Sequence, residues 1–266
     1  MILMMLESPV GAPEAVSLLG HDIRWRLARQ LSASDRTVGE LVTAVGERQN
    51  LVSYHLGLLR QAGLVLERRS SRDSRDVYYS LNLGRLRGGL DHAFSSLHPT
   101  LRIPPLEAQP AIIEGKRQRR LLFVCTGNSA RSQLAEAIAR KLARGSVEVL
   151  SAGPEPTVVH PVALTVLKEL DIPAEGLRSK GIDEIRGRFD FVVTLCDVAR
   201  EDCPPFAGGP ELVHWSLPDP VRPGASSRDL LPAFRRTAAE LRLRITLLLP
   251  VVLEDVSRRP VLRRGA

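Results

Sequence analysis

A short apolar segment that ends in a cysteine constrains this chain most. Residues 121–124 read Leu-Leu-Phe-Val, Cys125 follows directly, and Arg131 comes six positions later. This pattern predicts a buried strand, then a loop of small and polar residues, then a helix. The amide groups of such a loop can surround an anion together with the helix N-terminus. They should also favour the thiolate form of Cys125, so the segment predicts a nucleophile inside a binding site for a tetrahedral oxyanion.

The sequence of this loop, Cys-Thr-Gly-Asn-Ser-Ala-Arg-Ser, resembles the active-site loop of the low-molecular-weight protein tyrosine phosphatases and of the related thioredoxin-coupled arsenate reductases. The resemblance implies that the loop binds phosphate or arsenate and that Arg131 clamps the oxyanion. It also implies that Asn128 and Ser132 hold the loop and hydrogen-bond the thiolate. The alternative is a cysteine that is simply buried ahead of a helix. The predicted oxyanion-binding loop comprises Thr126, Gly127, Asn128, Ser129, Ala130 and Ser132.

Two further cysteines, Cys196 and Cys203, complete the three that the chain contains. An odd count indicates reactive thiols in a reducing compartment rather than a disulfide framework. Cys196 follows an apolar run, residues 191–195, that predicts a parallel strand ending near the Cys125 loop. The structural alternative is a zinc site, but two cysteines seven residues apart with no companion pair match no usual spacing of zinc ligands.

The spacing of Cys196 and Cys203 resembles the redox pair of thioredoxin-coupled arsenate reductases. The resemblance implies a relay of three thiols. Cys125 attacks arsenate, and Cys196 then attacks the Cys125 sulfur and releases arsenite. Cys203 finally resolves the 125–196 disulfide, which leaves a 196–203 disulfide for an external reductant. No cofactor is expected beyond that reductant, which would be thioredoxin or a low-molecular-weight thiol.

An Asp-Pro pair at Asp219 follows the last predicted strand. Taken alone, the pair is an ordinary turn signal. In the phosphatase superfamily a carboxylic acid at the matching position protonates the leaving oxygen, and the resemblance assigns that role to Asp219. Tyrosine phosphatases of this class usually carry aromatic residues just after the pair, whereas this chain continues Val-Arg-Pro-Gly. The difference favours a small inorganic substrate.

The first hundred residues predict a winged helix-turn-helix. Thr37 and Glu40 have the spacing of a capping box at the start of the second helix, and Gly63 is placed to end the third. A hairpin with a charged turn follows. The predicted helices span residues 23–31, 38–45 and 50–62, and the predicted strands span residues 64–69 and 77–81.

The third helix, with Ser53, His55, Leu56, Leu59 and Ala62 to Val65, resembles the recognition helix of ArsR-family repressors. The resemblance implies a homodimer joined through residues 84–97 and the first twenty residues. The alternatives to DNA binding are that His55 is a histidine at the edge of the core and that the wing arginines belong to a solvated turn. The predicted groove-facing residues are Gln49, Asn50, Ser53, Tyr54 and His55. The predicted phosphate contacts of the wing are Arg68, Arg69, Arg72 and Arg75.

Residues 1–120 contain no cysteine, although arsenic sensors of this family hold the metalloid with cysteines. The DNA-binding half should therefore not sense arsenite through thiols of its own. Asp91, His92 and His98 could bind a divalent metal, but three such residues without further partners are more often helix surface, and we expect no metal site.

Four segments are predicted. They are an ArsR-like α+β winged helix over residues 1–98, a Pro-rich basic linker over 99–119, a low-molecular-weight phosphatase-like α/β domain over 120–250, and a basic tail over 251–266. The α/β domain should contain a parallel sheet of about four strands with helices on both faces.

The sequence favours an arsenate reductase fused to a regulator of arsenic resistance. Its net charge of +7 permits binding to an operator DNA. We expect a cytoplasmic protein without a membrane segment or secretory signal. Two alternatives stay open: a low-molecular-weight tyrosine phosphatase, and a regulator whose second domain senses an oxyanion without catalysis.

Overall fold

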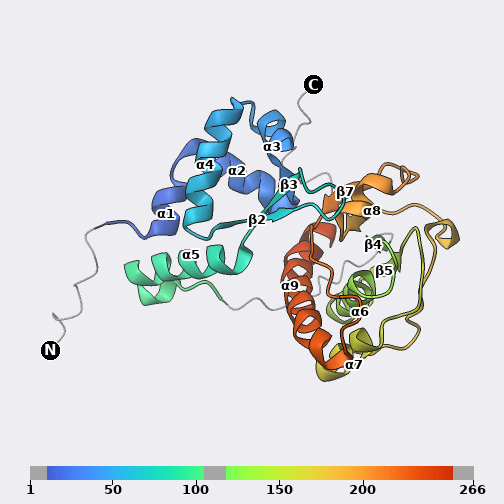
Figure 1. The fold of residues 1–266 in the computed structure, drawn as a ribbon. Helices are drawn as coiled ribbons and strands as arrows, with labels where there is room; N and C mark the ends of the chain where they lie inside the picture. The colour runs from blue at the N-terminus through green and yellow to red at the C-terminus, as the bar shows by residue number, and fades with distance from the viewer. Residues whose placement is uncertain (1–10, 105–117, 254–266) are drawn as a thin grey trace.

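The computed structural model describes residues 11–104 and 118–253. These residues form a helical N-terminal domain and an α/β C-terminal domain (Figure 1). Each domain has a hydrophobic core of its own, around Leu27, Leu41 and Leu56 in the first and around Phe123 and Phe234 in the second. Among the described residues, none of the helices is both long enough and apolar enough to cross a membrane.

The N-terminal domain is the predicted winged helix. Its helices are α1 (Glu14–Leu19), α2 (Asp22–Ala33), α3 (Val38–Val45), α4 (Gln49–Gln61) and α5 (Leu83–Leu97), with a short 3-10 helix η1 (Pro99–Leu101). Strands β1 (Arg36–Thr37), β2 (Val65–Arg69) and β3 (Val77–Leu81) form an antiparallel sheet in the order β1-β3-β2. The hairpin of β2 and β3 with its connecting turn is the wing.

Two local signals in this domain are confirmed. Thr37 caps α3, and the Glu40 carboxylate accepts a hydrogen bond from the Thr37 backbone N–H at 2.8 Å, which completes the capping box. Gly63 has φ +70°, in the left-handed region, directly after the C-cap of α4. Such a residue ends a helix and turns the chain into the following strand.

The C-terminal domain is built on the predicted four-stranded parallel sheet, whose order is β5-β4-β6-β7. Its strands are β4 (Arg119–Val124), β5 (Val147–Ala152), β6 (Phe191–Thr194) and β7 (Glu211–His214). Val124 pairs with Thr194, so β4 and β6 end side by side. The residues that follow these two strands therefore meet at one edge of the sheet.

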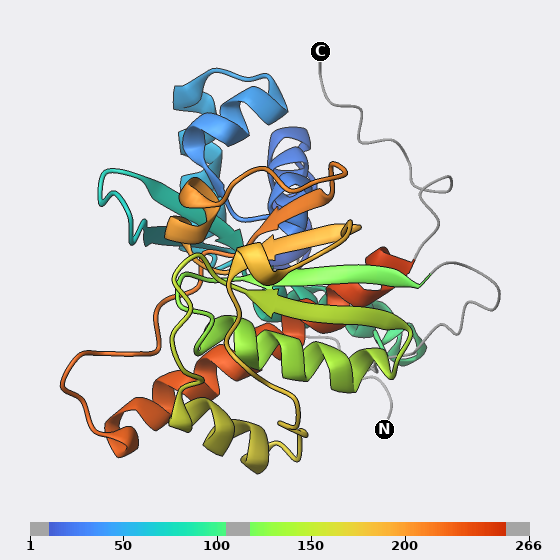
Figure 2. The same ribbon diagram turned by 90° about the vertical axis from the view of Figure 1, so that its right-hand side faces the viewer.

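The helices of this domain are α6 (Arg131–Ala143), α7 (Pro161–Glu169), α8 (Asp197–Asp202) and α9 (Ser227–Leu253), with a 3-10 helix η2 (Ile182–Glu184). Figure 2 shows α6 and α9 lying together along one face of the sheet. Helix α9 continues beyond the domain end predicted at residue 250, because Val252 and Leu253 are buried in the core. The rest of the predicted tail and most of the predicted linker lie outside the described residues.

The two domains are joined by buried polar contacts at the end of β7. The Asp35 N–H donates to the His214 carbonyl at 2.8 Å, and the His214 N–H donates to Ser34 Oγ at 2.9 Å. The Asp35 carboxylate accepts from the Ser216 N–H at 2.8 Å and from the Arg244 guanidinium at 2.9 Å. Residues just ahead of β1 thus satisfy backbone groups that β7 would otherwise leave unpaired at the edge of the sheet.

Candidate active site

Cys125 lies directly after β4 and is 2% exposed. The loop that follows is held from outside through its carbonyl groups. The Thr126 and Ser129 carbonyls accept from the N–H groups of Glu155 and His160, at 3.1 Å and 2.9 Å. The Gly127 carbonyl accepts from the Thr157 N–H at 3.0 Å. The loop is therefore fixed by the segment that follows β5.

The orientation of these carbonyls determines where the loop amides point. In a trans peptide the C=O of one residue and the N–H of the next point in opposite directions. Because the carbonyls of Thr126, Gly127 and Ser129 face outward, the N–H groups of Gly127, Asn128 and Ala130 face into the loop. Helix α6 begins at Arg131, at the far end of the same loop. The result is a ring of donors at a helix N-terminus, which is suited to an oxyanion.

A buried hydrogen-bond network fixes Asn128 and directs a hydroxyl group at Cys125. Asn128 Oδ1 accepts from the Lys180 N–H at 2.8 Å, which assigns its Nδ2 as the donor to Ser132 Oγ and Ser151 Oγ, both at 2.8 Å. Since Ser132 Oγ already accepts this bond, its own proton is free for the Cys125 sulfur, 2.9 Å away. Asn128 has φ +44°, a conformation that asparagine tolerates better than most residues.

Sequence reasoning missed a second layer of residues that supports this network. Glu136 is fully buried, and its carboxylate contacts Ser151 Oγ, Arg140 and the Lys180 ammonium, the last at 3.2 Å. Gly153 lies so close to the loop that a Cβ there would be 2.4 Å from the carbonyl oxygens of Cys125 and Thr126. A glutamate on the apolar face of α6 was the one signal available, and its partner Lys180 was not visible from local spacing.

Arg131 and Asp219, which the sequence assigned to separate roles at one site, form an ion pair. The Arg131 guanidinium donates to Asp219 Oδ2 at 2.9 Å and to the Leu217 carbonyl at 3.1 Å. The arginine side chain is 9% exposed and the aspartate side chain 54% exposed. Asp219 is therefore open to solvent at the mouth of the loop, while Arg131 lies beneath it.

The three cysteines are all free, and Cys196 and Cys125 both lie near enough to act on the thiol of Cys203. Cys196 is 1% exposed, and its sulfur lies 3.3 Å from the hydroxyl oxygen of Thr126, the residue after Cys125. Cys203 is half-buried at the other end of α8. Burial raises the pKa of the Cys203 thiol to about 12, and the neighbouring Cys196, Asp202 and Cys125 act in the same direction. Its unreactive form is thus favoured while α8 is intact.

Asp197, the residue after Cys196, is the centre of a buried polar cluster that the sequence did not reveal. Its Oδ1 accepts from Ser216 Oγ at 2.6 Å and lies 3.2 Å from His214 Nε2. Its Oδ2 accepts from the Ser71 N–H at 2.7 Å and from the Arg68 guanidinium. Burial opposes ionisation of Asp197, but these hydrogen bonds hold its pKa well below the usual range.

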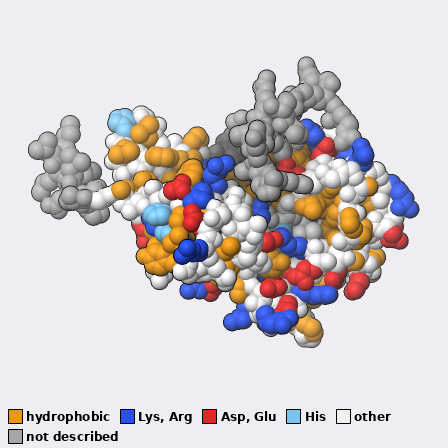
Figure 3. All heavy atoms as spheres, turned by 90° about the horizontal axis from the view of Figure 1, so that it is seen from above, with side chains coloured by type: hydrophobic (Ala, Val, Ile, Leu, Met, Phe, Trp, Pro, Cys, Tyr) orange, Lys and Arg blue, Asp and Glu red, His pale blue; other side chains and the backbone are white. Residues whose placement is uncertain are grey.

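The predicted DNA-reading residues divide into two groups. Gln49, Asn50, Ser53 and Tyr54 are exposed on one side of α4. The structure places His55 differently from the expectation, because it is 4% exposed and its ring lies 4.4 Å from that of His21. The basic and acidic side chains seen from above are interspersed over the surface (Figure 3).

The wing arginines also divide. Arg69 bonds the Ser74 carbonyl and Arg75 pairs with Asp73, both within the wing. Arg68 and Arg72 instead reach the C-terminal domain, where Arg72 pairs with Asp202 at 2.6 Å. Of the residues weighed for a metal, Asp91 accepts from the Ile103 N–H and His98 contacts Thr100. Among the described residues there is no group of three or more possible metal ligands.

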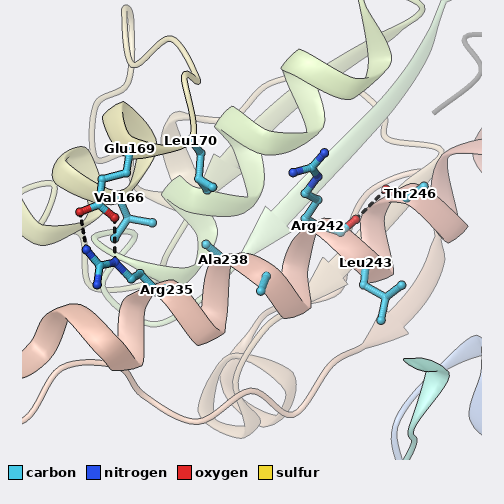
Figure 4. A pocket seen from close by; sticks show the side chains of 9 residues that line it. Val166, Glu169, Leu170, Arg235, Ala238, Arg242, Leu243 and Thr246 are labelled. Atoms are coloured by element: carbon cyan, nitrogen blue, oxygen red, sulfur yellow. Dashed lines mark hydrogen bonds and ion pairs between the residues drawn. The ribbon is translucent and has the colours of Figure 1, made fainter. Parts of the chain in front are cut away.

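A separate pocket of about 580 Å³ lies between α7 and α9. Figure 4 shows the Glu169–Arg235 ion pair at one end, with Leu170, Ala238 and Leu243 along the lining. None of the predicted site residues lines this pocket, so its walls play no part in the chemistry of the Cys125 loop.

The comparisons with known proteins agree with this geometry. Residues 120–258 match the family "Low molecular weight phosphotyrosine protein phosphatase", and residues 21–66 match "Bacterial regulatory protein, arsR family". An arsenate reductase of Halalkalibacterium halodurans is 38% identical over 126 residues, which are 47% of this chain and 91% of that protein. Arsenate reductase 1 of Bacillus cereus is 41% identical over 107 residues, 40% of this chain and 80% of that protein.

A solved arsenate reductase in the phosphate-binding state is similar over 51% of this chain and 99% of its own, with 31% identity and a TM-score of 0.45. The family match over residues 120–258 covers more than half of the chain. The chain belongs to the low molecular weight phosphotyrosine protein phosphatase family, and it carries a regulatory domain of the arsR family ahead of that domain.

Proposed function

We propose that this chain reduces arsenate to arsenite through a relay of Cys125, Cys196 and Cys203, and that its N-terminal domain binds DNA. The observation that carries the enzymatic proposal is the placement of Cys196 against the Cys125 loop. A phosphatase needs the first thiol alone. The second thiol at the end of the neighbouring strand is what a reductase requires, and the relatives from Halalkalibacterium and Bacillus carry that activity in their names.

In the first step the Cys125 thiolate attacks the arsenic of bound arsenate. The loop amides and Arg131 hold the oxyanion, and the Ser132 hydroxyl stabilises the sulfur anion until it reacts. A hydroxyl group of arsenate leaves as water after it takes one proton from Asp219, which is exposed at the mouth of the loop. Binding of the oxyanion draws Arg131 away from Asp219 and so frees the carboxyl group to approach the leaving oxygen.

In the second step the Cys196 thiolate attacks the sulfur of Cys125. A disulfide forms between the two cysteines, the sulfur–arsenic bond breaks, and its electron pair stays on arsenic, which leaves as arsenite. The 3.3 Å contact between Cys196 Sγ and Oγ1 of Thr126, the residue after Cys125, supports this step.

In the third step the Cys203 thiolate attacks the Cys196 sulfur and releases the Cys125 thiolate. The cysteines cap opposite ends of the six-residue helix α8, and a separation of seven positions at helical rise places their Cα atoms about 10 Å apart. A disulfide needs Cα atoms within about 7 Å, so α8 must unwind for this bond to form. Unwinding also exposes Cys203 and removes the burial that raises its pKa. The product is a 196–203 disulfide that thioredoxin or a low-molecular-weight thiol reduces.

The DNA-binding half presents α4 as its reading helix, with Gln49, Asn50, Ser53 and Tyr54 toward the major groove. Helices α1 and α5 pack against each other at the end of this domain in Figure 1. Exposed Phe94 and Leu97 on α5 provide apolar surface for a homodimer.

The test is arsenite production with a thioredoxin system. Wild type should turn over many times. Cys125→Ser and Cys196→Ser should form no arsenite, and Cys203→Ser should form one equivalent and stop with a 125–196 disulfide, identified by peptide mass spectrometry. Full turnover by the Cys196 variant, or aryl phosphate hydrolysis as the dominant activity, would show a phosphatase instead.

A further inference from the structure

The wing of the DNA-binding domain is docked on α8, the helix between the two shuttle cysteines. The Asp197 carboxylate accepts hydrogen bonds from the Ser71 N–H at 2.7 Å and from the Ser71 hydroxyl at 3.0 Å. The Arg68 guanidinium donates to the same carboxylate and to the Ser216 carbonyl, the latter at 2.9 Å. Asp197 is fully buried, so these bonds are shielded from water.

The contact extends along the whole helix. At its C-terminal end Arg72 pairs with Asp202 at 2.6 Å and lies 3.8 Å from Glu201. From α8 itself Arg200 pairs with Glu40 of α3, and its guanidinium lies 5.6 Å from the centre of the Tyr78 ring. We call this set of bonds the wing–α8 contact; it is formed by Arg68, Ser71 and Arg72 with Asp197, Glu201 and Asp202.

The wing–α8 contact exists in a structure with all three thiols reduced. The bonds depend on α8 being helical, because the helix sets the spacing between Asp197 and Asp202. A disulfide between Cys196 and Cys203 is incompatible with that helix, as the distance between its ends shows. Oxidation must therefore separate the carboxylates of α8 from the wing arginines.

We infer that the redox state of Cys196 and Cys203 controls the DNA affinity of this chain through the wing–α8 contact. In the reduced state Arg68 and Arg72 form ion pairs with the carboxylates of α8. In the oxidised state these two arginines are free to bind DNA phosphates. The inference rests on the proposed function, since it takes from it the 196–203 disulfide and the DNA-binding role of the winged helix.

The expected size of the effect follows from counterion release. Each phosphate contact adds about 0.9 to the slope of log affinity against log salt, so two arginines add about 2 per protomer. Over a fourfold rise in salt the oxidised protein should lose about tenfold more affinity than the reduced protein. By linkage, DNA should in turn favour the unwound α8 and expose Cys203.

The experiment uses the full chain with Cys125→Ser, in which one intramolecular disulfide is possible. Diamide takes two electrons and two protons from Cys196 and Cys203 and forms that disulfide without arsenate. Binding to a labelled duplex of arbitrary sequence is then measured over a range of salt for both redox states, because phosphate contacts do not depend on sequence. Hydrogen exchange of the peptide over residues 70–76 reports whether the Ser71 amide has lost its acceptor.

Two variants test the mechanism. Glu201→Gln with Asp202→Asn removes the acidic partners of Arg72 and should give the reduced protein about half of the added salt slope. The matched control is Glu169→Gln with Asp171→Asn, which makes the same change in charge at the end of α7, far from the wing (Figure 1). The control should retain the full difference between redox states. Cys125→Ser with Cys203→Ser, treated with diamide, should show none.

Tighter binding and a steeper salt slope on oxidation, with loss of protection at residues 70–76, support the inference. Equal DNA affinity in both redox states overturns it, and so does a redox difference that persists without Cys203. Absence of DNA binding in either state also overturns it, and places the failure in the DNA-binding half when the wild-type chain still produces arsenite. Redox-dependent DNA binding together with a wild-type chain that produces no arsenite would instead refute the relay and leave the inference from the wing–α8 contact standing.

Discussion

Arg131 and Asp219 form an ion pair of 2.9 Å across the mouth of the Cys125 loop. The two residues are 88 positions apart in the sequence. Their roles in the proposed chemistry compete, because an arginine engaged by the aspartate is less available to an oxyanion, and an aspartate engaged by the arginine is less available to the leaving oxygen.

Replacement of this aspartate should separate binding from catalysis. In Asp219→Asn the arginine is released, and inorganic phosphate should bind up to about fivefold more tightly, since a half-exposed ion pair is worth at most about 1 kcal/mol. Arsenite formation should fall by about 10² to 10⁴ because the acid is lost. Calorimetric titration and an arsenite assay measure the two effects. Equal changes in both, or any change in Asp171→Asn, would contradict the assignment.

Removal of the hydroxyl group beside the nucleophile should slow its chemistry without unfolding the domain. In Ser132→Ala the Cys125 sulfur loses the donor at 2.9 Å. A hydrogen bond to a charged group is worth about 1.5–3 kcal/mol, so alkylation of Cys125 by iodoacetamide at neutral pH should slow by about tenfold or more. The melting temperature checks that the fold is kept. Unchanged alkylation would show that Ser132 serves the loop alone.

Gly153, the residue after β5, lies so close to the Cys125 loop that we expect no side chain to be tolerated there. In Gly153→Ala the new Cβ would meet two carbonyl oxygens at 2.4 Å, and the backbone would have to shift. We expect a loss of about 1–3 kcal/mol in the free energy of unfolding and loss of phosphate binding. Gly39→Ala is the control, because it lies in α3 with nothing within 4 Å of the new atom and should be neutral or stabilising. Retained phosphate binding in Gly153→Ala would argue against the loop geometry.

The stability of the domain should depend on pH through Cys203. Folding raises the pKa of this thiol from 9.0 to about 12, so the native state favours the neutral form. The contribution is therefore complete below about pH 9 and is lost as the pH rises toward 12. Denaturant unfolding of wild type and Cys203→Ser across this range measures the difference. Wild type should lose more stability than the variant, and parallel curves would contradict the burial of Cys203.

The sequence alone predicts those features whose geometry depends on residues close together along the chain. The capping box of Thr37 and Glu40, the turn at Gly63 and the order strand, cysteine, loop and helix are all set by short-range geometry, so the positions of α3, β3 and β4 could be read from spacing. The position of Cys196 beside the Cys125 loop was also predictable, because parallel strands that pair side by side end at the same edge of the sheet.

The tertiary structure alone decided which charges meet across the fold. The pairing of Glu136 with Lys180, the intrusion of Gly153 behind the loop and the capture of Asp197 by Arg68 and Ser71 join residues that are distant in the chain. Local periodicity shows that a side chain is polar but not which buried group it will meet. Desolvation makes an unpaired buried charge costly, so such partners are fixed only when the elements pack. Packing is also what directs Arg68 and Arg72 of the wing toward the carboxylates of α8.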